Sequence, residues 1–341
     1  MQPISHIDTQ NGILYFRGRN AVHLAQNKSY EEVLFLLVNG RVPNEEETWS
    51  LRRRMSELRH IAQDNGVDFV KQKDAGGLPQ LALKLENFSK AHRLDTHDTL
   101  LLFVTMIPVV VAAEWRRKLH GESPILAGDT LSHTENFPWI LDERERTPKW
   151  NKDFQTCIVL HMDDPDNPSL TALTNTYAKK GSISAALNSA IDEHVQPLHH
   201  GAGEHVMQMA REIEHPSKTR ETIERQLDRG ERIFGLGHRI YRTIDPRAVH
   251  LSEILHRLTI GTELEWIYDV IKSISQVGPK VIKERKGITV FPNVDLYNAA
   301  VYCALGLPET LNTYLFAISR AAGWMAHIVE YEKKEDISGC P

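Results

Sequence analysis

The sequence contains little cysteine and no excess of positive charge. Its three cysteines, Cys157, Cys303 and Cys340, are too few and too widely spaced for a disulfide framework or a zinc site. We therefore expect a reducing, cytoplasmic setting. The 40 lysines and arginines stand against 45 acidic residues, which gives a net charge of −5, and no basic run with interleaved aromatic residues occurs. This balance argues against nucleic acid as a partner.

Long apolar runs and nucleotide-binding loops are also missing. The longest apolar run, Leu100 to Ala113, is interrupted by Thr105 and Pro108. It is shorter than the ~20 residues that span a bilayer, so it predicts a buried core helix and no membrane partner. The first residues have no basic start and lead to no apolar stretch, which argues against a secretory signal. Neither the Rossmann nor the Walker glycine pattern occurs.

Helix signals occur along most of the chain. Ser29 begins a capping box before an apolar helix that should end at Gly40, and Asn44 begins a second helix with an acidic first turn. The segment 310–332 predicts a long helix, whereas weak alternation within 1–16 predicts a small hairpin. These patterns favour an all-α protein. Because 341 residues exceed the size of a single hydrophobic core, we expect two lobes.

Three short segments, far apart in the chain, carry residues suited to forming a carbon–carbon bond from a thioester. They are Pro197-Leu198-His199, Gly235-Leu236-Gly237-His238 running on to Asp245-Pro246-Arg247, and Phe291-Pro292-Asn293-Val294-Asp295. In order and spacing they resemble the citrate synthase family. The resemblance covers nearly the whole chain, through the segments 4–8, 12–18, 131–137 and 317–324.

The resemblance implies a homodimer of two-lobed, all-α subunits with a small N-terminal β-hairpin. The large helical domain would comprise residues 1–200 and 307–341. The small domain, residues 201–306, would close over the active site.

The resemblance also implies a role for each motif residue. Removing the weakly acidic proton next to a thioester requires a base and a group that stabilises the enolate. Asp295 would be the base, His199 would donate a hydrogen bond to the thioester oxygen, and His238 would polarise and protonate a ketone. Arg247 and Arg320 would hold substrate carboxylates, for which a two-pronged donor is suited.

The implied substrates are an acyl-CoA and a 2-oxo acid, with acetyl-CoA and oxaloacetate as the first choice and free CoA as a product. Coenzyme A enters as part of a substrate, so we expect no separate cofactor. The backbone of one segment would clasp the CoA, its glycine allowing close approach. This segment consists of Arg232, Ile233, Phe234, Gly235 and Leu236. Propionyl-CoA, which would give 2-methylcitrate, or a different acceptor is the alternative.

Some positions depart from the family pattern. The family usually has His-Ala-Asp-His-Glu where this chain has His-Met-Asp-Asp-Pro, beginning at His161. His161 and Asp164 thus belong to the implied acceptor site, with Asp164 replacing a histidine that contacts the 2-oxo acid. An anion there should repel a dianionic acceptor and favour one with fewer carboxylates. No arginine follows Arg320, although the family has an Arg-Pro pair near its C-terminus. His200 and Gly203 also replace a glycine and an asparagine.

Each motif residue also has an ordinary structural interpretation. Asp295 can cap the helix that follows it, Arg247 can pair with Asp245 on the surface, and Arg320 can be a satisfied helix residue. A metal cluster is a further alternative, made of His199, His200, Glu204 and His205. Its spacing lacks His-Glu-x-x-His and no cysteine joins it, so we expect no metal. The second hypothesis for function is a non-catalytic homologue that has lost its acceptor clamp.

Overall fold

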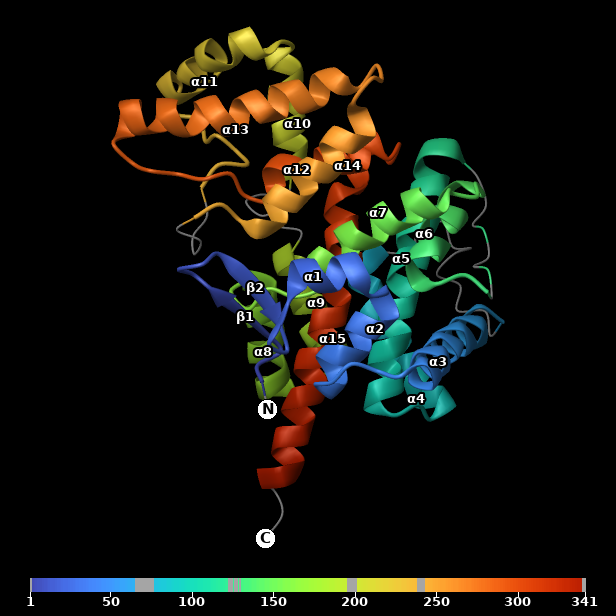
Figure 1. Cartoon of the computed structure of the whole chain (residues 1–341). Helices are drawn as coiled ribbons and strands as arrows, with labels where there is room; N and C mark the ends of the chain where they lie inside the picture. The colour runs from blue at the N-terminus through green and yellow to red at the C-terminus, as the bar shows by residue number, and fades with distance from the viewer. Residues whose placement is uncertain are drawn as a thin grey trace.

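The computed structural model describes residues 2–64, 77–121, 130–194, 201–237 and 243–338, together with Ile125 and Gly128. Within these residues it consists of fifteen α-helices, two short 3-10 helices and one small sheet, which confirms the predicted all-α class (Figure 1). The first helices are α1 Ala21–Asn27, α2 Tyr30–Asn39, α3 Glu45–Asp64, α4 Gly77–His92, α5 Thr96–His120, α6 His133–Asp142, α7 Pro148–Leu160, α8 Pro168–Lys180 and α9 Ile183–His194. The later ones are α10 Ala202–Ile213, α11 Thr219–Asp228, α12 Pro246–Thr259, α13 Glu265–Lys286, α14 Asp295–Ala304 and α15 Asn312–Ser338. The 3-10 helices are η1 Pro216–Lys218 and η2 Glu309–Leu311.

The larger group of helices is built around α5. This helix packs against α3, α4, α6 and α15, while α8 packs against α9. The apolar run Leu100–Ala113 is buried throughout, so the predicted core helix is confirmed. Among the described helices, the stretch Thr96–Arg117 is the one long and apolar enough to cross a membrane, but 83% of its most apolar window is buried inside the protein.

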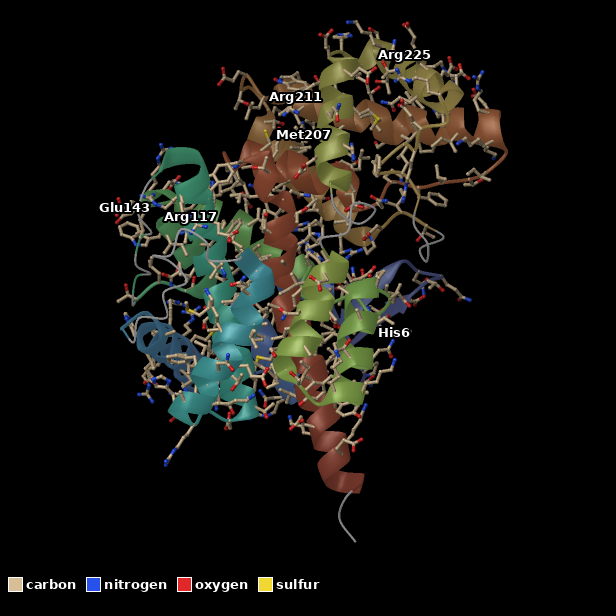
Figure 2. The ribbon with its side chains drawn as sticks, turned by 180° about the vertical axis from the view of Figure 1, so that it is seen from behind. His6, Arg117, Glu143, Met207, Arg211 and Arg225 are labelled. Carbon is tan, nitrogen blue, oxygen red and sulfur yellow. The ribbon has the colours of Figure 1, made fainter. Side chains whose placement is uncertain are left out.

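Helices α10 to α14 form a second group, at the top of Figure 1. Here α14 packs against α10, α12 and α13, and α11 packs against α13. Seen from behind, Met207 and Arg211 of α10 lie in this group, whereas His6 of β1 lies in the larger group (Figure 2). Helix α15 runs from the second group down through the first (Figure 1). The division at residues 201 and 306 stays a prediction.

The predicted hairpin near the N-terminus is confirmed and has one more strand than expected. Strand β1, Ser5–Asp8, pairs antiparallel with β2, Ile13–Phe16. Strand β3, Arg19–Asn20, then pairs with the end of β2. Because β3 has only two residues, an alternating sequence pattern cannot predict it. It ends at Asn20, which caps the following helix α1.

The predicted helix ends agree with local chemistry. The Ser29 side chain accepts from the backbone of Glu32, whose carboxylate accepts from the backbone of Ser29, and the helix ends at Gly40 with φ +76°. Asn44 likewise accepts the Glu47 N–H at 2.8 Å, at the start of α3. The last helix begins two residues later than predicted and continues to Ser338. It packs along α5 and α2.

Candidate active site

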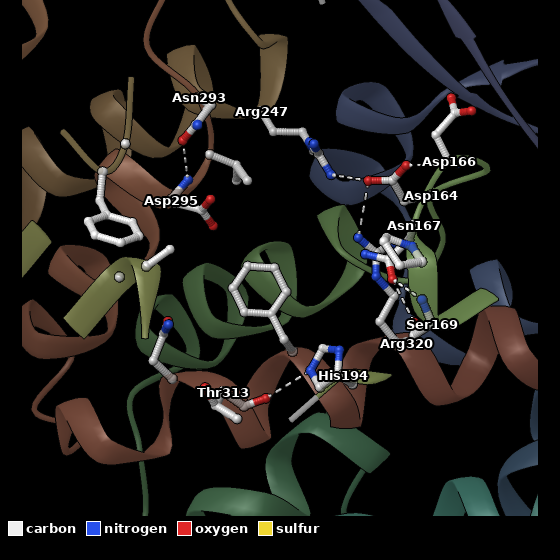
Figure 3. Close-up of a pocket in the computed structure, with 18 of the residues that line it drawn as sticks. Asp164, Asp166, Asn167, Ser169, His194, Arg247, Asn293, Asp295, Thr313 and Arg320 are labelled. Carbon is white, nitrogen blue, oxygen red and sulfur yellow. Dashed lines mark hydrogen bonds and ion pairs between the residues drawn. The ribbon is translucent and has the colours of Figure 1, made fainter. Parts of the chain in front are cut away.

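A cavity of about 420 Å³ brings together segments that are far apart in the sequence (Figure 3). Its wall comes from the turn between α7 and α8, the end of α9, the start of α10, residues 232–237 and the first residues of α12, α14 and α15. Of the residues predicted to act on or bind the substrates, Asp164, Arg247, Asp295 and Arg320 line this cavity. His199 and His238, also predicted to act there, lie outside the described residues.

Two of the predicted motifs lie side by side as a short antiparallel pair. Leu236 bridges Pro292, the Gly237 N–H donates to Phe291 O at 2.7 Å, and the Asn293 N–H donates to Gly235 O at 3.0 Å. The Asn293 side chain adds a hydrogen bond from Nδ2 to Gly237 O at 2.6 Å. This pairing fixes the loop before α14 against the predicted CoA segment.

Glycine is required at position 235 for two reasons. Its φ is +78°, which disfavours L side chains, and a Cβ there would lie 2.9 Å from the Cα of Leu296. The close approach at this glycine is made to the helix that carries Asp295, whereas the predicted approach to CoA stays a prediction.

Asp295 is the first residue of α14 and does not cap it. The side chain of Asn293 accepts the Asp295 N–H at 3.0 Å, so the backbone donor is satisfied from outside the helix. Asp295 is half-buried at the cavity wall. Withdrawal from water raises the pKa of its carboxyl above the ordinary value, although nearby Arg247 lowers it. A raised pKa makes the ionised carboxylate a better base.

Arg247 is paired with Asp245, but in the interior rather than on the surface. The exposed fractions of the two residues are 2% and 1%. Asp245 caps α12 by accepting the Arg247 N–H at 3.0 Å, and the same carboxylate receives the guanidinium, with Nη2 at 2.8 Å from Oδ2. Pro246 at the first helical position has no N–H that needs a partner. A local capping motif thus aims the guanidinium into the site.

Asp164 faces both arginines that were predicted to hold substrate carboxylates (Figure 3). Its Oδ2 lies 3.7 Å from Nη1 of Arg247 and 3.4 Å from Nη2 of Arg320. The neighbouring Asp163 accepts from Ser5 Oγ at 2.5 Å and lies 3.0 Å from His327 Nε2, which anchors the turn that carries Asp164.

His161 lies behind the cavity wall. It is completely buried, its ring meets Phe316 edge-on at 4.4 Å between centroids, and Phe316 is the side chain that lines the cavity. Nδ1 lies 2.6 Å from Cys157 O, so it carries the proton and donates it. Burial lowers the pKa of His161 well below its usual range, which keeps the imidazole neutral.

The predicted CoA segment divides between cavity and core. Arg232, Phe234 and Gly235 line the cavity, whereas Ile233 and Leu236 are buried in the hydrophobic core. The Arg232 guanidinium lies over the Phe234 ring at 5.5 Å. This stack presents a cation and an aromatic face at the cavity.

Of the two departures near α10, Gly203 lies within the described residues and is closely packed. His205 stacks on Phe234 at 4.5 Å between centroids, and the other predicted histidines of a metal cluster, His199 and His200, lie outside the described residues. A Cβ at Gly203 would lie 2.7 Å from the Asn312 amide nitrogen. The Asn312 amide and the Ala299 side chain therefore fill the space beside Gly203.

Comparisons with known proteins agree with this geometry. A family model described as "Citrate synthase, C-terminal domain" matches residues 2–338. The citrate synthase of Synechocystis is 33% identical over 95% of this chain and 83% of its own length. "Citrate synthase 2" of Bacillus subtilis is 33% identical over 93% and 86%. The citrate synthase structure from Thermotoga maritima superposes with a TM-score of 0.84 at 26% identity and covers 98% of this chain and 89% of that one.

Proposed function

The chain belongs to the citrate synthase family, and we propose that it joins the acetyl group of acetyl-CoA to oxaloacetate and releases CoA. Members of this family are acyltransferases. The observation that carries the proposal is the cavity itself, in which a half-buried carboxylate, Asp295, faces the same space as Arg247 and Arg320. Such a cavity can hold a base beside groups that attract carboxylates.

Asp295 removes a proton from the acetyl methyl group, and the methyl carbon then attacks the ketone carbon of the acceptor. His199 donates to the thioester oxygen while the enolate forms, and His238 protonates the ketone oxygen as the new bond closes. Water then cleaves the thioester, so that CoA leaves as the thiol and the acyl carbon becomes a carboxylate. Arg247 and Arg320 orient the acceptor through its carboxylates.

The proposal also covers the oligomeric state, the cellular location, the binding of CoA and the need for a cofactor. The enzyme acts as a homodimer in the cytoplasm, where the scattered cysteines stay reduced. The CoA lies along residues 232–236, where Arg232 and Phe234 face the cavity and can meet its phosphate and adenine groups. No cofactor or metal is needed beyond the CoA thioester, because the chemistry requires only a base and hydrogen-bond donors.

The test is release of the CoA thiol by the purified protein with acetyl-CoA and oxaloacetate, with propionyl-CoA in parallel. Asp295→Asn should lower kcat by roughly 10²- to 10⁴-fold, the contribution of a positioned general base. The wild-type rate should also fall on the acid side, since Asp295 must be ionised and its pKa lies above the ordinary 3.8.

Asp166→Asn is the matched control, because Asp166 lines the same cavity from an exposed position. It should keep kcat within about threefold, a change near the ~0.6 kcal/mol of thermal energy. Equal rates of thiol release by the wild type and Asp295→Asn, or no thiol release by a folded wild type, would favour the non-catalytic homologue.

A further inference from the structure

One carboxylate of the chain occupies the pair of guanidinium groups proposed to receive the acceptor. Asp164 Oδ2 is directed at both Arg247 and Arg320, at 3.7 and 3.4 Å, in a cavity that all three residues line (Figure 3). A carboxylate oxygen between two guanidinium groups is the arrangement in which proteins bind a carboxylate ligand. Asp164 thus has the position and the chemistry of a ligand carboxylate.

Asp164 is held there by the fold. It is 8% exposed, and its Oδ1 accepts the backbone N–H of Asp166 at 3.3 Å. The preceding residue, Asp163, is fixed by Ser5 and His327, and the Gly323 N–H donates to the carbonyl of Met162 at 3.1 Å. These contacts fix the backbone of the turn, so that the Asp164 side chain starts from a position facing the arginines.

The two arginines already have carboxylate partners. Arg247 is paired with Asp245 as well as with Asp164, and Arg320 also faces Asp164. An acceptor carboxylate that enters this group adds negative charge beside Asp164, unless it takes the place of Asp164. The Asp164 contacts are longer than the 2.7–2.9 Å of a tight charge-assisted bond, so a better-placed carboxylate can displace it.

We propose that Asp164 is an intramolecular competitor of the acceptor's carboxylate and the residue that sets acceptor affinity. The inference rests on the proposed function, because it assumes that the acceptor binds at Arg247 and Arg320. It differs from the simpler idea that the site only lacks the histidine donor at this position. If a donor is all that is missing, only a residue that restores it can improve binding. If Asp164 competes, removing its charge is enough.

The experiment compares Asp164→Asn, Asp164→Ala and Asp164→His with the wild type and with Asp166→Asn as the charge control. The KM for oxaloacetate should fall about tenfold or more in Asp164→Asn and Asp164→Ala, the size of one charge-assisted hydrogen bond. Asp166→Asn should change it less than twofold. The KM for acetyl-CoA, which does not bind at the arginine pair, should stay within about twofold in all variants, a free-energy change near ~0.4 kcal/mol.

A binding readout separates this inference from the proposed chemistry. Malonate, a dicarboxylate without a ketone, should raise the melting temperature of Asp164→Ala and Asp164→Asn more than that of the wild type. A larger malonate shift without thiol release from any variant would support competition by Asp164 while overturning the condensation. Thiol release by the wild type, with neither KM nor malonate shift changed in Asp164→Asn and Asp164→Ala, would overturn the competition and leave the condensation standing. Asp164→Ala decides between the two ideas, because asparagine also offers an amide N–H donor. Improvement in Asp164→His, with or without Asp164→Asn, but not in Asp164→Ala would also overturn the competition, in favour of the missing donor.

Discussion

Replacing Asp245 should destabilise the protein, because this residue both caps α12 and holds the buried guanidinium of Arg247. Asp245→Ala removes the partner of a buried ion pair, which costs about 3–5 kcal/mol, and a helix cap, which costs about 1 kcal/mol. With exposed fractions of 1% and 2%, the cavity water and the Asp164 carboxylate at 3.7 Å can replace the lost carboxylate only in part. We therefore expect the free energy of unfolding to fall by about 4–6 kcal/mol.

Asp245→Asn separates the two contributions. Asparagine keeps an oxygen that caps the helix but loses the charge, so its cost should be smaller by about 1 kcal/mol. The measurement is urea unfolding followed by helical circular dichroism, at one protein concentration because the proposed dimer makes stability concentration-dependent.

Asp228→Asn is the control, since it breaks an ion pair with Arg285 in which both side chains are largely exposed. Such an exposed pair contributes little to stability, so the control should unfold at the same urea concentration as the wild type. If Asp245→Asn unfolded at the same urea concentration as Asp228→Asn, the argument from burial would be refuted. If Asp245→Ala and Asp245→Asn had the same free energy of unfolding, the contribution assigned to the helix cap would be wrong.

Two further predictions test the backbone and the pH dependence. Gly235→Ala should lower stability by about 2–5 kcal/mol, from the positive φ and the contact with Leu296. Gly230 also has a positive φ, +74°, but open space around its Cβ position. Gly230→Ala should therefore lower stability only by the backbone strain of about 1–2 kcal/mol. Equal melting temperatures for the two variants would contradict a steric clash at position 235. Burial lowers the pKa of His133 to about 3, so between about pH 6.5 and 3 the unfolded chain binds the proton that the folded chain excludes. Stability should therefore fall by about 2 kcal/mol from pH 7 to pH 5 through this residue. His133→Gln should flatten that slope in urea titrations, and an unchanged slope would show that His133 does not contribute it.

The sequence was a good guide to the fold wherever local chemistry decides an element. The capping box at Ser29 and the stop at Gly40 need only neighbouring residues, and both are present as predicted. Strand β3 was missed because pairing with β2, not its own two residues, makes it a strand. Similarly, the apolar run of α5 predicts burial, but its partners α3, α4, α6 and α15 follow only from packing.

The residues of the candidate site could be predicted from the sequence, but their contacts and burial could be predicted only in part. The motifs identified Asp295, Arg247 and Arg320, and the fold gathers all three at one cavity. The alternative that Asp295 caps α14 is wrong, because Asn293 takes the backbone N–H. The pairing of Arg247 with Asp245 was anticipated as a surface contact, yet it is buried. Burial at the start of α12 depends on what packs over that helix, which no local pattern encodes.

The two adjacent aspartates illustrate where sequence inference ends. Asp163 and Asp164 are the same residue type at successive positions, but their carboxylates have different partners. Asp163 turns toward Ser5 and His327, and it can do so because Gly323 has no Cβ, which would lie 2.5 Å from its Oδ1. With Asp163 fixed in that direction, its neighbour is left facing the arginines. A glycine on α15, over 150 positions away, thus helps to aim Asp164 at Arg247 and Arg320.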